Sequence, residues 1–278
     1  MPQLMAEILK LFYRLGWKHA ASIQIGGKLN ALYFKYEPEI LGQNLDLLTI
    51  SLKSTDLIRV VNSPPYINEL VRSAILTGWC LEIQQESALF NSYEFKLKGN
   101  PWTGSSNEAV FSKRFINKLI EIFKHNSFDL YSICDLSMNY DRVSTFYFNR
   151  VPNQASVMPK ILSVSLNESD KIRIIDDKCD FAGIVRECLV RNWIRGIQKE
   201  SDYFSAREFK LNGKPFLGTS QETVDFNIFI MVLLDYINKK YKNIRFIGGA
   251  DLSAKYVKND NTSTTQDVSV HTLFFESC

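Results

Sequence analysis

Apolar residues recur with the period of an α-helix in two matched segments of the chain. They stand at positions i, i+3, i+4, i+7 and i+8 from Ile67 to Ile75, and the same spacing returns from Phe181 to Leu189. This spacing lines up one apolar stripe along a helix. The pattern therefore predicts two amphipathic helices, which run into Trp79 and Trp193.

Strand-like runs follow each tryptophan and predict an antiparallel hairpin with a loop of several residues. The segments Gly99–Pro101 and Gly213–Pro215 end these hairpins, because glycine admits positive φ and proline removes a ladder donor. Sequences of the form S/T-x-x-E, which end at Glu108 and Glu222, then fit a capping box. A second helix and a second hairpin are predicted after each of them.

These elements belong to a sequence block that occurs twice. Residues 51–110 align with residues 165–224 at a constant spacing of 114 without a gap, and 23 positions are identical. Self-similarity at a fixed spacing indicates a repeat architecture. We predict an α+β fold: two tandem β-α-β-β-α-β-β units with antiparallel sheets, each with two helices on one face. The predicted divisions are 1–44, 45–152 and 153–278.

The first 44 residues resemble only the back half of such a unit. A helix with the apolar stripe Leu4, Ile8, Leu11, Phe12 and Leu15 is followed by one predicted hairpin. An α-β-β half-unit cannot bury both of its faces alone. We therefore expect it to pack on the first full unit, or to form a homo-oligomer contact with a second copy of the chain.

Composition narrows the class of protein but not its chemistry. The chain is 45% hydrophobic and 23% charged, which is typical of globular proteins. Five cysteines without close pairs, and no signal peptide, predict a reduced, intracellular protein. No apolar run is long enough for a transmembrane segment. The formal net charge of +3 is only mildly basic and leaves the kind of partner open.

We find no motif that predicts a cofactor, a metal site or a catalytic site. The three histidines, His19, His125 and His271, are far apart in the chain and not equivalent between the units. An enzyme remains a third alternative, and it would rely on the repeated charged residues Asp56 and Arg59, with Asp135, or on their second-unit equivalents.

Repeated polar residues allow two interpretations: a binding surface built once per unit, or ion pairs between strands that both copies inherited. They are Asp56/Asp170, Arg59/Arg173, Arg72/Arg186, Gln84/Gln198, Glu86/Glu200, Glu94/Glu208, Lys96/Lys210 and Asp135/Asp251. Of the repeated aromatics, Trp79 and Trp193 are expected to close the cores. Trp102 and Phe216 follow a turn proline and are expected to be more exposed.

The two copies differ most clearly in charge. The second copy has basic residues at seven positions where the first has two, so its helix and hairpin are predicted to carry a local positive field. We therefore predict a non-enzymatic binding or scaffold module that recognises an acidic macromolecular partner, most simply an acidic protein surface. A nucleic-acid binder that uses the same cations and exposed aromatics is the alternative. The predicted partner-binding residues are Arg191, Arg195, Lys199, Arg207, Lys210, Lys214 and Phe216.

Overall fold

The structure is a computed structural model of the 278-residue chain. It describes residues 2–25, 29–62, 64–102, 107–134, 144–152, 157–216, 221–252 and 271–277.

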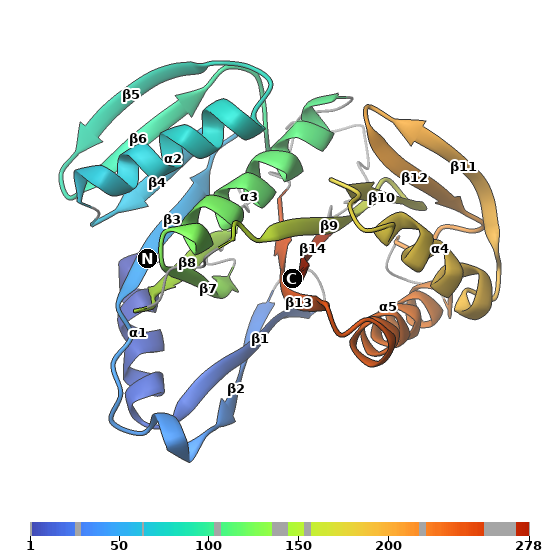
Figure 1. Ribbon diagram of the computed structural model, residues 1–278, viewed down its shortest axis with the longest axis horizontal. Helices are drawn as coiled ribbons and strands as arrows, with labels where there is room; N and C mark the ends of the chain where they lie inside the picture. Colours follow the sequence, from blue (N-terminus) through green and yellow to red (C-terminus); the bar gives the residue numbers. More distant parts are fainter. Residues whose placement is uncertain are drawn as a thin grey trace, which may run out of the picture.

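Each predicted unit forms a six-stranded antiparallel sheet (Figure 1). The first unit comprises β3 (Leu47–Lys53), β4 (Leu57–Val61), α2 (Pro65–Gly78), β5 (Ile83–Leu89), β6 (Ser92–Leu97), α3 (Asn107–His125), β7 (Phe128–Cys134) and β8 (Thr145–Arg150). The second comprises β9 (Lys160–Asn167), β10 (Lys171–Ile175), α4 (Phe181–Asn192), β11 (Ile197–Tyr203), β12 (Ala206–Leu211), α5 (Gln221–Lys240), β13 (Ile244–Asp251) and β14 (His271–Ser277). The strand orders β5-β6-β4-β3-β8-β7 and β11-β12-β10-β9-β14-β13 are equivalent, which confirms the tandem α+β repeat.

The apolar stripes fold as their spacing predicts. Ile67 and Val71 of α2 and Phe181 and Val185 of α4 are buried under their sheets. Each helix ends at its tryptophan, whose backbone N–H still donates to the carbonyl four residues earlier. The expected hairpin loops of several residues are wrong, because Leu89 pairs with Ser92 and Tyr203 pairs with Ala206. Two-residue turns close both hairpins, with positive φ at Phe90 in the first and at Phe204 and Ser205 in the second.

The N-terminal half-unit is a third copy of the α-β-β half. It comprises α1 (Pro2–Arg14), β1 (Trp17–Ile25) and β2 (Leu29–Tyr36). In β1, β7 and β13 alike, the pairing shifts at one residue directly after the third residue of the strand. The ring of Phe12 stacks on Phe34 with centroids 4.5 Å apart, and at the equivalent place Phe123 lies 4.7 Å from Phe148. The shared bulge and the shared ring pair identify one building block in three places.

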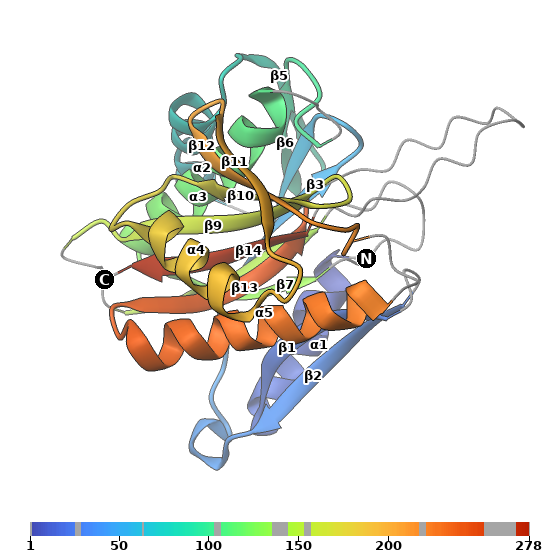
Figure 2. The same cartoon turned by 90° about the vertical axis from the view of Figure 1, so that its right-hand side faces the viewer.

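Helix α3 joins the two units, because it packs on the first sheet with one side and on the second sheet with the other (Figures 1 and 2). Ile161, Ala250 and Phe274 of the second unit belong to the same buried cluster as the core of the first. Helix α1 repeats this arrangement one step earlier: Leu9 packs against Tyr147 on the face of the first sheet that lies opposite α2 and α3. The hydrophobic core therefore continues across the unit boundary.

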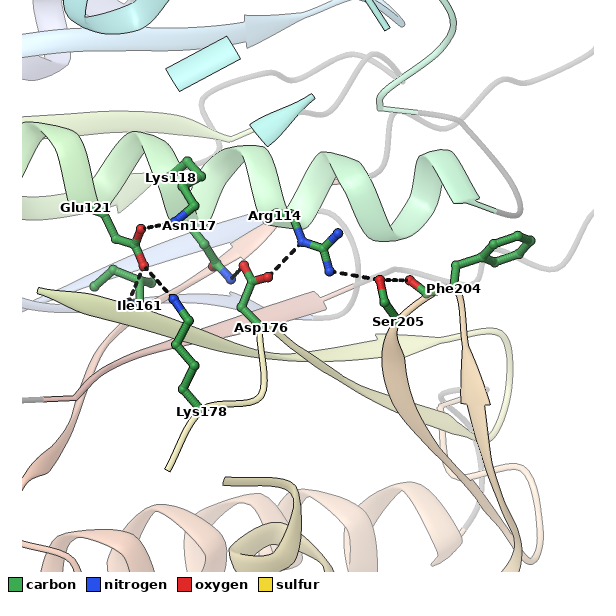
Figure 3. A network of polar contacts seen from close by, with 9 residues as sticks. All are labelled: Arg114, Asn117, Lys118, Glu121, Ile161, Asp176, Lys178, Phe204 and Ser205. Carbon is green, nitrogen blue, oxygen red and sulfur yellow. Dashed lines mark hydrogen bonds and ion pairs between the residues drawn. The ribbon is translucent and has the colours of Figure 1, made fainter. Parts of the chain in front are cut away.

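Polar contacts strengthen the junction between α3 and the second unit (Figure 3). Arg114 Nε lies 2.7 Å from Asp176 Oδ1, and Asn117 Nδ2 donates to Asp176 Oδ2 at 3.0 Å. One turn further on, Glu121 accepts the backbone N–H of Ile161 at 3.0 Å and an ion pair from Lys118. These contacts hold α3 in one orientation against the loop after β10 and the start of β9.

Candidate partner-binding surface

Most of the repeated charged residues form repeated ion pairs within each unit. Arg59 pairs with Glu94 in the first unit, and in the second Arg173 lies 2.7 Å from Glu208. The other two repeated pairs are Arg72–Glu86 with its counterpart Arg186–Glu200, and Lys96–Asp56 with its counterpart Lys210–Asp170. The repeated polar pattern is thus explained by contacts between neighbouring elements.

Two of the predicted partner-binding residues, Lys210 and Arg207, form ion pairs with carboxylates of the second sheet and its turns. Lys210 Nζ lies 4.0 Å from Asp170, and Arg207 contacts both Glu200 at 3.1 Å and Asp202 at 3.2 Å. Arg207 also lines a groove of about 450 Å³ beside α4, whereas Lys210 pairs across the sheet with Lys199. Successive strand residues point to opposite faces, so Arg207 and Lys210 do not share one surface.

Of the other four predicted cations, Arg191 lies in the last turn of α4, Arg195 and Lys214 both lie beside Glu222, and Lys199 lies on β11 directly opposite Lys210. We call Arg191, Arg195, Lys199 and Lys214 the basic corner. Arg191 contacts Glu187 at 2.7 Å, and Arg195 contacts Glu222 at 3.2 Å. Among the residues that the structure describes, the ammonium groups of Lys199 and Lys214 form no ion pair.

The carboxylates near the basic corner are shared. Glu187 also receives Lys240 Nζ at 3.0 Å, so two cations face this one carboxylate. Hydrogen bonds from Tyr236 and then from Lys240 lower the pKa of Glu187 to about 2, which keeps it ionised at neutral pH. The basic corner and Lys240 together have five cations, and among the described residues the carboxylates that they contact are two, Glu187 and Glu222.

Glu222 has a structural task besides its contact with Arg195. Its carboxylate accepts the backbone N–H of Lys214 at 2.6 Å, and Glu108 accepts that of Asn100 at 3.1 Å in the first unit. The carboxylate thus ties the turn after the hairpin to the start of the next helix. The glycine in each turn has positive φ, and a Cβ on Gly213 would lie 2.5 Å from Glu222 Oε2. The sequence had suggested a capping box here, but its serine and threonine positions lie outside the described residues.

The aromatic residues are more buried than expected. Trp79 and Trp193 are in the cores, as predicted. The expectation for Trp102 is wrong: its side chain is only 1% exposed, because it packs beside Phe115. Phe216 is half-buried and lies 4.6 Å from the ring of Phe226. Phe216 therefore packs against the core of the second unit with part of its surface.

Exposed apolar side chains, which the sequence pattern does not reveal, lie next to Arg191 and Arg195 of the basic corner. Ile194 is 85% exposed between the buried Trp193 and Arg195, and Val190 is exposed one turn earlier. In the first unit the position of Ile194 is held by Cys80. A large apolar side chain exposed next to cations is a more informative observation than either feature alone.

The residues considered for catalysis are explained by structural contacts where the structure describes them. Asp56 and Arg59 are each committed to an ion pair, and Asp135 lies outside the described residues. His19 is on β1, His125 ends α3 and His271 begins β14. Within the described ranges, no group of three potential metal-binding side chains occurs. No helix there has the length and apolarity to cross a membrane.

One buried titratable residue was missed by sequence reasoning. Lys113 of α3 is 4% exposed, and its ammonium group lies 3.4 Å from Ser112 Oγ. Burial lowers its pKa to about 8; the charge of Arg173 lowers it further, and that of Asp251 opposes the shift. Nothing in its helical spacing distinguishes this lysine, because the sheet that covers it comes from the other unit.

A groove of about 370 Å³ lies where the three α-β-β half-units meet. Its lining includes Lys18, Asp129 and Arg245, which occupy the same position in β1, β7 and β13. Lys124 and Arg245 both bind Glu276, at 2.6 and 2.8 Å. These contacts pair charges of α3, β13 and β14 and link two of the half-units to one another.

Comparison with known proteins identifies the domain family to which the chain belongs. Searches of curated proteins and of solved structures found no match to the chain. A single family model matches it twice, over residues 46–149 and 160–262, and the description of that family names no activity. The first match spans the first sheet as far as β8, the second spans the second sheet except β14, and together they cover most of the chain. The chain therefore belongs to this domain family and carries two copies of its domain.

Proposed function

We propose that the protein is a non-enzymatic binding or scaffold module that recognises an acidic macromolecular partner, an acidic protein surface above all. The basic corner of the second unit is the proposed contact site. Arg207 and Lys210, although predicted from sequence, are assigned to ion pairs within the fold, and Phe216 to the core.

One observation supports this proposal most directly: Ile194 is 85% exposed directly before Arg195, and the four cations of the basic corner have uncharged counterparts in the first unit. Those counterparts are Thr77, Leu81, Gln85 and Asn100. Protein interfaces typically combine an apolar centre with a polar, arginine-rich surround. The fold of the two units does not require this difference, because the same elements form in both.

The charge of the basic corner favours an acidic partner. Lys199 lies directly opposite Lys210 across the β11–β12 hairpin, and like charges at this distance destabilise a strand pair. An incoming carboxylate would relieve that repulsion. Electrostatic complementarity of this kind raises association rates and selects partners by charge.

Binding of nucleic acid through the same cations is the alternative. It relies on aromatic rings for base stacking, and the two aromatics considered for that role are buried or packed, Trp102 beside Phe115 and Phe216 on Phe226. The acidic protein surface is therefore the better-supported partner.

Charge reversal with a matched control tests the proposal. The test variant carries Arg195→Glu, Lys199→Glu and Lys214→Glu, and the control carries glutamates at the equivalent Leu81, Gln85 and Asn100. Both are compared with wild type in pull-downs, with and without nuclease, and in anisotropy titrations with a fluorescent poly-glutamate peptide and with single-stranded RNA.

We expect the variant with the reversed second unit to bind the poly-glutamate peptide at least about tenfold more weakly and to retain correspondingly less acidic protein in the pull-down. The control should bind both as the wild type does. Equal loss in both variants would contradict the proposal. Binding restricted to RNA, abolished by nuclease and falling with a log–log salt slope of about −0.7 per phosphate contact, would replace it with the nucleic-acid alternative.

A further inference from the structure

The apolar stripe of α1 faces away from the rest of the chain. Leu4, Leu11 and Leu15 are 61%, 52% and 53% exposed. Their neighbours on the other side of the helix, Ala6 and Leu9, are the buried ones. The sequence predicted the stripe correctly as an amphipathic face, yet within the described part of the chain that face is largely uncovered.

The internal repeat shows what such a face packs against. The bulges and ring pairs align Leu4 with Phe115 and Phe12 with Phe123 on α3. Both phenylalanines of α3 are fully buried between their own sheet and α2. The stripe of α1 is therefore equivalent to the inner face of α3, and none of the described residues takes the place beside it that α2 has beside α3.

Strand β2 has the matching free edge. In the complete units, β8 pairs with β3 and β14 pairs with β9, both antiparallel. The equivalent strand β2 pairs only with β1, in a two-stranded sheet. An unpaired edge beside an exposed apolar helix face is a template for association.

The arrangement of successive half-units leaves room for a partner beside the exposed face of α1. Helix α3 packs on the six-stranded sheet of its own unit with one side, its inner side, and on the sheet of the next unit with the other, its outer side. Helix α1 carries the first sheet on its outer side in the same way. By the same geometry, a broad sheet fits on the inner side of α1.

We propose that a second copy of this chain occupies the place, with β2 pairing antiparallel to β2 of the other copy about a two-fold axis. The two hairpins then form a continuous four-stranded sheet, and both α1 helices lie on the same face of it. Each helix covers a hairpin of two strands that lie about 4.8 Å apart. The two helices are therefore separated by about two strand spacings, which agrees with the roughly 8–10 Å at which helices pack. The second α1 thereby takes the place that α2 has beside α3.

The strand is self-complementary in this arrangement. When the axis passes through Tyr33, Leu32 lies opposite Phe34 of the other copy, and Lys35 lies opposite Ala31. Leu32 and Phe34 are the side chains of β2 that pack toward α1, so the apolar face continues across the axis. Lys35 does not face itself, and a closed two-fold contact of this kind pairs the free edge of β2 in both copies.

The opposite end of the chain offers a less suitable surface. The outer face of α5 corresponds to the face of α3 that binds the second sheet, but Ile228 and Met231 stand where α3 has Arg114 and Asn117. Both are exposed. This face lacks the polar groups that hold α3 to the second unit. The strand equivalent to β2 is β14, and it is already paired on both sides, with β13 and with β9.

Sedimentation velocity of the full chain over a range of concentrations tests the inference. The wild type is expected at twice the 32.0 kDa chain mass, and Leu4→Glu with Leu11→Glu is expected at the mass of one chain. The control, Ile228→Glu with Met231→Glu, places the same charges on α5 and should remain dimeric. Circular dichroism checks that each variant is folded, and Leu15→Glu alone replaces the double variant if that fails to fold.

Dissociation by the α1 substitutions alone supports the proposed dimer. A wild type that sediments as a single chain at all concentrations would overturn it. So would a dimer that survives the α1 substitutions, or one that only the α5 substitutions dissociate.

Discussion

Replacement of Asp176 by alanine tests whether α3 fuses the two units into one cooperative body. Asp176 stands in the loop after β10 and accepts hydrogen bonds from Arg114 and Asn117 of α3 (Figure 3). It has no other connection to the first unit among the contacts that the structure describes. The substitution removes both interactions and leaves the sheets themselves unchanged.

The magnitude follows from the geometry of these contacts. The Arg114 and Asp176 side chains are 21% and 12% exposed, so the ion pair is partly shielded from water. A hydrogen bond to a charged group contributes about 1.5–3 kcal/mol, and partial exposure reduces the sum for the pair of bonds to about 2 kcal/mol. Asp176 also has φ of 54°, a conformation in which alanine costs about 1 kcal/mol. The free energy of unfolding should fall by about 3 kcal/mol.

Asn62 provides the matched control, because it occupies the equivalent position in the first unit with φ of 51°. Its side chain is exposed and makes no hydrogen bond with the described residues. Asn62→Ala should therefore lose only the conformational part, about 1 kcal/mol. Urea unfolding followed by far-ultraviolet circular dichroism and by tryptophan fluorescence gives the free energy of unfolding for each variant.

Two results would refute this account of the junction. Equal losses for Asp176→Ala and Asn62→Ala would show that the contacts to α3 contribute nothing. Two separate transitions in the wild type would show that the units unfold independently, despite the buried cluster that crosses their boundary.

Two further predictions concern single residues. Gly213→Ala should cost at least about 2 kcal/mol, because positive φ and the close Glu222 carboxylate both oppose a Cβ; Gly42→Ala has similar φ with open space around it and should cost only about 1 kcal/mol in thermal or urea unfolding. A greater loss at Gly42 would contradict this. Lys113 has its pKa lowered from 10.5 to about 8, so the unfolded chain binds the proton more tightly and stability rises with pH between these values. Lys113→Met should remove that rise and increase the free energy of unfolding by roughly 3 kcal/mol at pH 7. The free energy of unfolding is measured from pH 7 to pH 10 for both proteins, and the same pH dependence in the variant as in the wild type would contradict a buried amine.

Local sequence patterns predicted the helices and strands because the side chains that form the pattern are the same ones that these elements bury. The stripes of α2 and α4 are spaced for a helix and are buried as one face. The duplication at a constant spacing then predicted the second unit from the first, and the half-unit was recognised from its hairpin.

Long-range packing is what the sequence could not predict. Trp102 follows a turn proline and was expected to be exposed, but Phe115 of α3 covers it. Arg207 and Lys210 looked like partners on one surface, yet strand alternation and ion pairs separate them. Such outcomes depend on which element packs over a residue, and helical or strand spacing carries no information about that.

The charge difference between the two units is the central claim of this account, and transferring it tests it most directly. A variant with Thr77→Arg, Leu81→Arg, Gln85→Lys and Asn100→Lys gives the first unit the basic corner of the second. Calorimetric titration with the poly-glutamate peptide measures the number of binding sites per chain. We predict one site in the wild type and two in the variant. A single site in both, at unchanged affinity, would contradict the claim that these four positions make the second unit a binding surface.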